Sequence, residues 1–199
     1  MESLERYAIY CGLLAPVISL GSTGLSTVVA PASEFTWEAY ALSDLGRASA
    51  RTFLLFNGGL LLGGLLGVVF AWPLWRHSRN LLERFGTVVF ALAVGGLGLV
   101  GVFYLPHELH TPVALLFFVG GPITQWLYGG GQLLAGDTES GAVSILFGFV
   151  HVVGWVGWTV AVEDPELWFA VPEMVASLAF GLWAVALARS LLDSSTVEA

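Results

Sequence analysis

The sequence predicts an all-α bundle of six membrane-spanning helices, and composition and run length lead to this class. Of the 199 residues, 56% are hydrophobic and only 11% are charged. A soluble domain carries about a quarter of its residues as charged groups, so lipid must cover the outside of this chain. Its apolar runs approach roughly 20 residues, which suits spanning helices, whereas the strands of a membrane barrel need only about 10.

Six apolar stretches are separated by polar connections, and we expect one integral membrane domain over residues 1–199. An even number of spans places both termini on one side of the membrane. That side also holds five of the seven arginines, and basic residues favour the cytoplasmic side. Both termini are therefore predicted to be cytoplasmic, in a multi-pass protein of the cell membrane. The predicted spans are residues 7–30, 51–72, 86–105, 113–134, 142–162 and 167–192.

The charge balance is acidic, with a formal net charge of −8 and no lysine. No basic patch is available to meet phosphates, which argues against nucleic-acid binding. Acidic connections with arginine as the only strong cation suggest a salt-loving source organism. Genomic base composition that favours arginine codons is the alternative.

Glycines in the second predicted span point to helix packing. Gly59, Gly63 and Gly67 recur every four residues and so share one helix face. Small residues at this spacing let a neighbouring helix approach closely. The alternative is a glycine-tolerant membrane helix without a particular partner. Besides the lipid bilayer, a second copy of the chain is a candidate partner through such glycine-rich faces.

Polar side chains gather toward the predicted outer face. Two lie in the first connection and two in the connection that follows the third span. Two more are roughly six residues, or about 9 Å, inside their spans at 1.5 Å per residue, and one is near the middle of the fifth span. Polar groups at such depths normally face the bundle interior or a cavity. We therefore expect a pocket built from Ser43, Asp44, Asn57, His107, His110, His151 and Glu173.

Three of these residues suggest a metal site. If a helical turn begins at Pro106, His107 and His110 project from one face. With a carboxylate such as Asp44 or Glu173 as third ligand and a water as fourth, they would suit zinc, and a zinc-activated water would give hydrolysis. The alternative is that the two histidines decorate a turn at a wet interface.

The other residues also have structural alternatives. Glu173 can cap its own helix, whose positive dipole end favours a carboxylate. Asp44 can pair with Arg47 or Arg51, or it can cap the second helix. His151 can be a buried neutral imidazole bonded to a neighbouring helix. Ser43 has no G-x-S-x-G surroundings that would mark a nucleophile, so no catalytic residue is assigned.

Several short motifs together resemble a known family. Ala41-Leu42-Ser43-Asp44-Leu45-Gly46 is followed by Phe56-Asn57 at the start of a glycine-rich span and by Pro106-His107 after the third span. The chain is similar in these motifs to the small six-span prokaryotic proteins of the domain of unknown function 998 family. The resemblance implies a six-helix membrane protein with these polar residues as its signature, and it implies no activity.

Three functions stay open from the sequence. The default is a multi-pass membrane protein whose outer pocket binds or passes a small molecule, lipid or ion. The first alternative is a zinc-dependent membrane hydrolase acting on lipid-like substrates. It has a distant likeness to seven-span hydrolases that use serine, aspartate and three histidines, although this chain lacks the seventh span. The second alternative is a structural membrane subunit.

Overall fold

The computed structural model describes residues 3–197, and side chains from 3 to 193. In this part of the chain six α-helices are long and apolar enough to cross a membrane, and no strand occurs. The predicted fold class is therefore confirmed. The elements are α1 (Ser3–Val29), the 3-10 helix η1 (Leu42–Gly46), α2 (Phe53–His77), α3 (Leu81–Val100), α4 (His110–Leu134), α5 (Thr138–Ala161) and α6 (Ala170–Val197).

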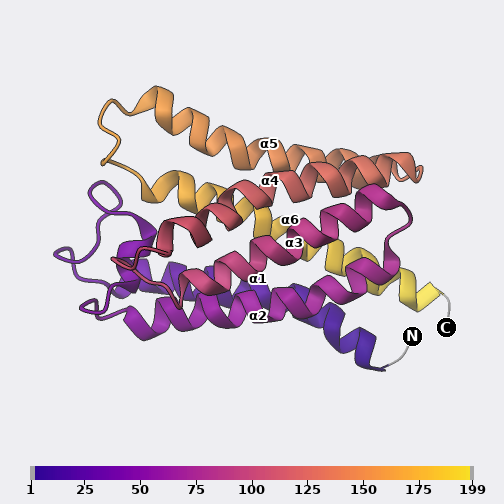
Figure 1. The fold of residues 1–199 in the computed structure, drawn as a ribbon, viewed down its shortest axis with the longest axis horizontal. Coiled ribbons are helices and arrows are strands. Elements are labelled where there is room, and N and C mark those ends of the chain that lie inside the picture. Colours follow the sequence, from indigo (N-terminus) through magenta and orange to yellow (C-terminus); the bar gives the residue numbers. More distant parts are fainter. Residues whose placement is uncertain (1–2, 198–199) are drawn as a thin grey trace.

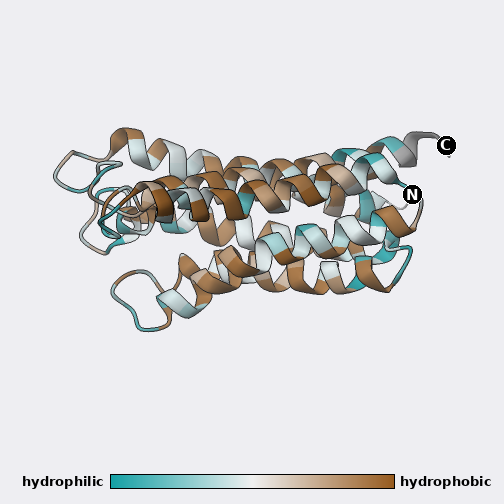
Figure 2. Cartoon of the chain, turned by 90° about the horizontal axis from the view of Figure 1, so that it is seen from above, coloured by the Kyte–Doolittle hydropathy of each residue, from teal (hydrophilic) through white to brown (hydrophobic). Residues whose placement is uncertain are grey.

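The six α-helices form a closed ring in chain order. Each α-helix packs against the next, and α6 closes the ring against α1 while also touching α4. The two termini lie at one end of the bundle (Figure 1), which we call the terminal end. The opposite end, which we call the loop end, carries residues 30–52, 101–109 and 162–169. Hydrophilic residues concentrate at both ends and hydrophobic ones between them (Figure 2), as expected for a bundle whose middle crosses a bilayer.

Helices α2 and α3 both extend beyond their predicted spans at the terminal end. Helix α2 continues through Pro73 to His77, because prolines are tolerated in membrane helices whose neighbours satisfy the freed backbone groups. Helix α3 begins at Leu81, where the Asn80 side chain accepts a hydrogen bond of 3.1 Å from the backbone N–H of Glu83. Glu83 is fully buried, and its carboxylate pairs with Arg79 at 2.6 Å. This pairing raises the pKa of Arg79 and lets a charged residue lie within a membrane helix.

The glycines spaced four residues apart in α2, Gly59, Gly63 and Gly67, pack inside the bundle rather than on its surface. Gly63 faces Ser19 and Ala15 of α1, and Gly67 faces Val94 of α3, so closely that an added Cβ would overlap these neighbours. The four-residue spacing therefore brings α2 against its two neighbours in the ring. Association between copies of the chain stays a prediction.

An aromatic layer fills the bundle toward the terminal end. Phe90 stacks on Phe180 with 5.6 Å between ring centroids, and it meets Phe70 edge-on at 5.9 Å and Trp183 at 6.1 Å. All four residues are buried. The layer fills the bundle interior between the terminal end and the loop end. The candidate site lies at the loop end.

Candidate functional site

The short helix η1 is held at the loop end by three buried side chains. Glu173 of α6 accepts a hydrogen bond of 2.6 Å from the backbone N–H of Leu42, the first residue of η1. Thr52 donates to the carbonyl of Leu45 at 2.7 Å, and the Asn57 amide donates to the carbonyl of Gly46 at 2.8 Å. Polar groups from α6 and from the start of α2 thus satisfy the backbone of a segment that would otherwise be buried without partners.

Asp44 is used within η1 itself. One of its carboxylate oxygens accepts from the backbone N–H of Ala41 at 2.9 Å, and the other pairs with Nε of Arg47 at 2.6 Å. Asp44 therefore pairs with Arg47, which is one of its structural alternatives. Its neighbour Ser43 lines a cavity instead.

This cavity, which we call the loop-end cavity, has a volume of about 420 Å³. Its polar groups come from η1, from the first turn of α4 and from the first turn of α6, while apolar side chains of α4, of α5 and of the segment before α6 form the rest of the wall. The lining residues are Ser43, Leu105, His110, Thr111, Ala114, Leu115, Phe118, Val119, Trp155, Phe169 and Glu173.

The loop-end cavity opens sideways, between α4 and α5. Thr111, Leu115 and Val119 recur every four residues and so lie along one face of α4. The side chains of Leu115 and Val119 are 53% and 52% exposed, on the part of the bundle that lipid surrounds. Helix α5 diverges from α4 toward the loop end (Figure 1), and α5 has the lowest buried share of the six spans. We call this side of the cavity, which the exposed apolar side chains of Leu115 and Val119 line, the lateral mouth.

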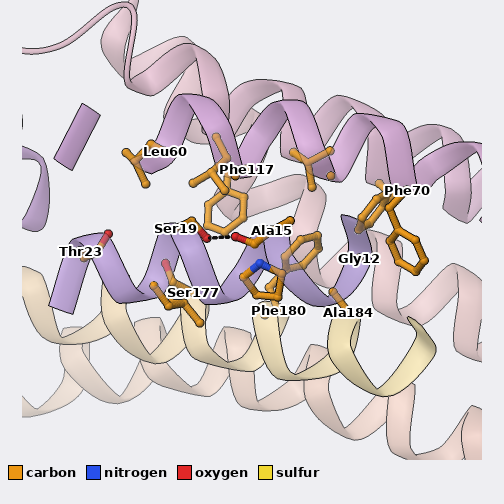
Figure 3. A pocket seen from close by; sticks show the side chains of 18 residues that line it. Gly12, Ala15, Ser19, Thr23, Leu60, Phe70, Phe117, Ser177, Phe180 and Ala184 are labelled. Atoms are coloured by element: carbon orange, nitrogen blue, oxygen red, sulfur yellow. Dashed lines mark hydrogen bonds between the residues drawn. The ribbon is translucent and has the colours of Figure 1, made fainter. Parts of the chain in front are cut away.

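Two narrower cavities continue from the loop-end cavity along the bundle axis. The first shares Ser43, His110 and Glu173 with it, and the second reaches the aromatic layer at Phe70; each has a volume of about 50 Å³. Figure 3 shows the second of them, where the Ser19 hydroxyl is bonded to the backbone of its own helix. Such volumes hold one or two waters, so the axis is closed to larger molecules in this conformation.

His110 presents a hydrogen-bond acceptor to the cavity. Its side chain is only 7% exposed, and its Nδ1 lies 2.8 Å from the carbonyl oxygen of Phe103. A carbonyl only accepts, so Nδ1 carries the proton, and Nε2 of the neutral ring is an acceptor. Among the described residues, Nε2 has no hydrogen-bond partner. The same is true of the second carboxylate oxygen of Glu173, Oε1, because the bond from Leu42 uses Oε2.

The remaining predicted residues lie outside this cavity. His107 is exposed in the loop before α4, where its Nδ1 accepts from the backbone N–H of Leu109 at 3.0 Å. Helix α4 begins at His110 rather than at Pro106, so the two histidines do not share a helix face. His151 is fully buried in α5, and neither ring nitrogen has a hydrogen-bond partner in the described part of the chain. Asn57 belongs to the support of η1.

Residues 3–193 contain no group of three or more histidine, cysteine, aspartate or glutamate side chains placed to hold a metal ion. The zinc site of His107, His110 and Asp44 stays a prediction, which elemental analysis of protein purified without chelator tests. Stoichiometric zinc that is lost in both His107→Ala and His110→Ala would establish the site. Zinc absent from the wild type, or unchanged in the two variants, would contradict it.

Several residues of the cavity carry no signal in the sequence. Ala114, Phe118, Trp155 and Phe169 are apolar residues in an apolar chain, so their type does not distinguish a cavity wall from a lipid-facing surface. Phe103 contributes only its carbonyl oxygen, which sequence patterns do not reveal. The spacing of Thr111, Leu115 and Val119 marks one helix face, but many faces in this chain look alike.

The chain matches no curated protein and no solved structure. A family model described as "Protein of unknown function (DUF998)" matches residues 13–190. The match runs from within α1 to within α6 and includes η1, the loop-end cavity and the aromatic layer. The motifs around Ser43, Asn57 and His107 therefore do indicate the family, and the chain belongs to the DUF998 family of membrane-helical proteins of unknown function.

Proposed function

We propose that this protein binds an amphiphilic, lipid-like molecule in the loop-end cavity, within the cell membrane. The head of the ligand lies against Ser43, His110 and Glu173, and its hydrocarbon tail lies along α4 toward the bilayer. The observation that carries the proposal is that one cavity is lined both by the half-exposed apolar side chains of Leu115 and Val119 and by a group of polar side chains.

The size and lining of the cavity support this ligand class. Its volume of about 420 Å³ falls within the roughly 300–1,000 Å³ of small-molecule sites, which are mostly apolar with a few placed polar groups. Here the polar groups lie in η1 and in the first turns of α4 and α6, and the apolar wall continues along α4 at Leu115, Phe118 and Val119, as a molecule with a head and a tail requires. A small ion would leave the apolar wall without a function.

The other functions find less support. Permeation needs a path past the aromatic layer, and the axial cavities are only about 50 Å³ each. A hydrolase needs a nucleophile or an activated water, yet Asp44 is paired with Arg47 and the two histidines lie apart. A purely structural subunit would not require a cavity of this volume beside half-exposed apolar side chains.

Photoaffinity labelling tests the proposal. The protein in phosphatidylcholine nanodiscs is titrated with twelve-carbon amphiphiles that carry a diazirine in the chain and an amine, an alcohol or a carboxylate as head. We expect saturable labelling of α4 and α5 residues near the mouth by at least one of them. Ala114→Trp, which fills the cavity, is expected to weaken this labelling by at least about tenfold, equivalent to 1.4 kcal/mol.

Ala186→Trp is the matched control, because Ala186 is exposed on α6 toward the terminal end. Its labelling at the mouth is expected to equal that of the wild type. Saturable labelling that persists in Ala114→Trp, or that none of the three probes produces, would refute the proposal.

A further inference from the structure

We infer that the head of the ligand is a primary ammonium group, held by the carboxylate of Glu173. This inference rests on the proposed function and names its ligand class: a cationic amphiphile with a single amine at the head. Three observations carry it, namely the incomplete partners of Glu173, the acceptors around it, and the charge of the loop end.

The Glu173 carboxylate lacks a counter-charge. The residue is 6% exposed and receives one hydrogen bond, from the backbone N–H of Leu42. In the described part of the chain no basic side chain pairs with it. The nearby Arg47 is engaged with Asp44 at 2.6 Å. A carboxyl group buried in a membrane protein avoids the cost of an unpaired charge by staying protonated or by pairing with a cation. A cation entering the loop-end cavity would let Glu173 ionise and would be its counter-charge.

The groups around the head position are acceptors. Oε1 of Glu173 can accept, Nε2 of His110 can accept because Nδ1 holds the proton, and the Ser43 hydroxyl can accept. An ammonium group has three N–H donors and no acceptor, so it matches three acceptors around one cavity. A carboxylate or phosphate head would meet Glu173 with like charge. A trimethylammonium head has the charge but no N–H group to donate.

The charge of the loop end favours the same ligand. Its two arginines are each opposed by an acid, Arg47 by Asp44 and Arg51 by Glu34 at 4.0 Å. Further exposed acids line the connections, and they raise the local concentration of cations at low ionic strength. These acids are Glu38, Glu108, Glu163, Asp164 and Glu166.

Head-group competition in nanodiscs tests the inference. Twelve-carbon amine, alcohol, carboxylate and trimethylammonium compounds without a diazirine compete against whichever photoreactive probe labels the wild type. We expect the amine to compete best, at least about tenfold better than the alcohol. Glu173→Gln keeps the volume of the side chain and an oxygen that can accept from Leu42. It should remove most of the preference for the amine, while competition by the alcohol should stay within about twofold of its wild-type value.

Ser43→Ala provides a second variant that leaves the support of η1 untouched. Competition by the amine should weaken in this variant, and competition by the trimethylammonium compound should not change, because only the amine donates hydrogen bonds. Equal competition by amine and alcohol in the wild type, or an amine preference that survives in Glu173→Gln, would overturn the inference. Saturable labelling in the same experiment would still support the binding of a lipid-like molecule. Absence of saturable labelling by every probe would instead defeat the proposed function.

Discussion

Replacing Gly64 with valine is expected to lower the free energy of unfolding by about 2–3 kcal/mol, near the upper range for overpacked sites. A Cβ at this position would lie 2.5 Å from the Cα and 2.6 Å from the backbone nitrogen of Gly98 on α3. Backbone atoms of a packed helix cannot rotate away as a side chain does, so α2 and α3 must separate. Unfolding by SDS in mixed micelles, followed by tryptophan fluorescence, measures the loss.

Gly58→Val is the matched control on the same helix. A Cβ at Gly58 would meet nothing within 4 Å, and valine has a better helix propensity than glycine. We expect a change within about 0.5 kcal/mol. An equal loss in both variants would mean that valine disturbs α2 itself, and would contradict the close contact between Gly64 and Gly98.

Asn57→Asp is expected to destabilise the protein by at least about 2 kcal/mol, because removing a donor from a buried acceptor costs about 1–3 kcal/mol and more when a charge is involved. The substitution keeps the size of the side chain but replaces the amide that donates to the carbonyl of Gly46 with oxygens. It also directs a carboxyl group toward that carbonyl. Since η1 carries Ser43, labelling of the loop-end cavity should weaken as well.

Thr36→Ala serves as the comparison for Asn57→Asp. The Thr36 hydroxyl accepts a hydrogen bond of 3.2 Å from the backbone N–H of Ala39 in an exposed part of the same connection. Its loss should change stability by less than about 0.5 kcal/mol, with labelling intact. If Asn57→Asp behaves like Thr36→Ala, the amide of Asn57 is not what holds η1 in place.

The polar residues chosen from the sequence do gather toward one end, yet the structure separates their tasks. Ser43, His110 and Glu173 line the loop-end cavity, whereas Asn57 supports η1 and His107 lies in an exposed loop. The structural alternative for Glu173 is a cap on its own helix, but its carboxylate accepts a hydrogen bond from η1, far away in the sequence. Hydropathy estimates how deep a residue lies in the membrane, but it does not say which direction the side chain faces.

The helix boundaries illustrate the same limit. Hydropathy ended the second span before Pro73 and began the third after Arg84, but α2 continues to His77 and α3 starts at Leu81. Buried pairing between Glu83 and Arg79 makes the longer helix possible. Pairing partners are chosen by the packing of neighbouring segments, so a count of apolar residues does not include them.

The sequence by itself determined that this protein crosses a membrane six times, because apolar side chains need lipid and a backbone in lipid must satisfy its own hydrogen bonds. It also indicated the family, through the motif from Ala41 to Gly46 and the Phe56-Asn57 pair. Only the tertiary structure decided which polar groups meet and where the bundle opens. Helices that are apolar on every side have no polar face to orient them. Their rotation is set by close contacts such as Gly64 against Gly98, and hydropathy does not predict those contacts.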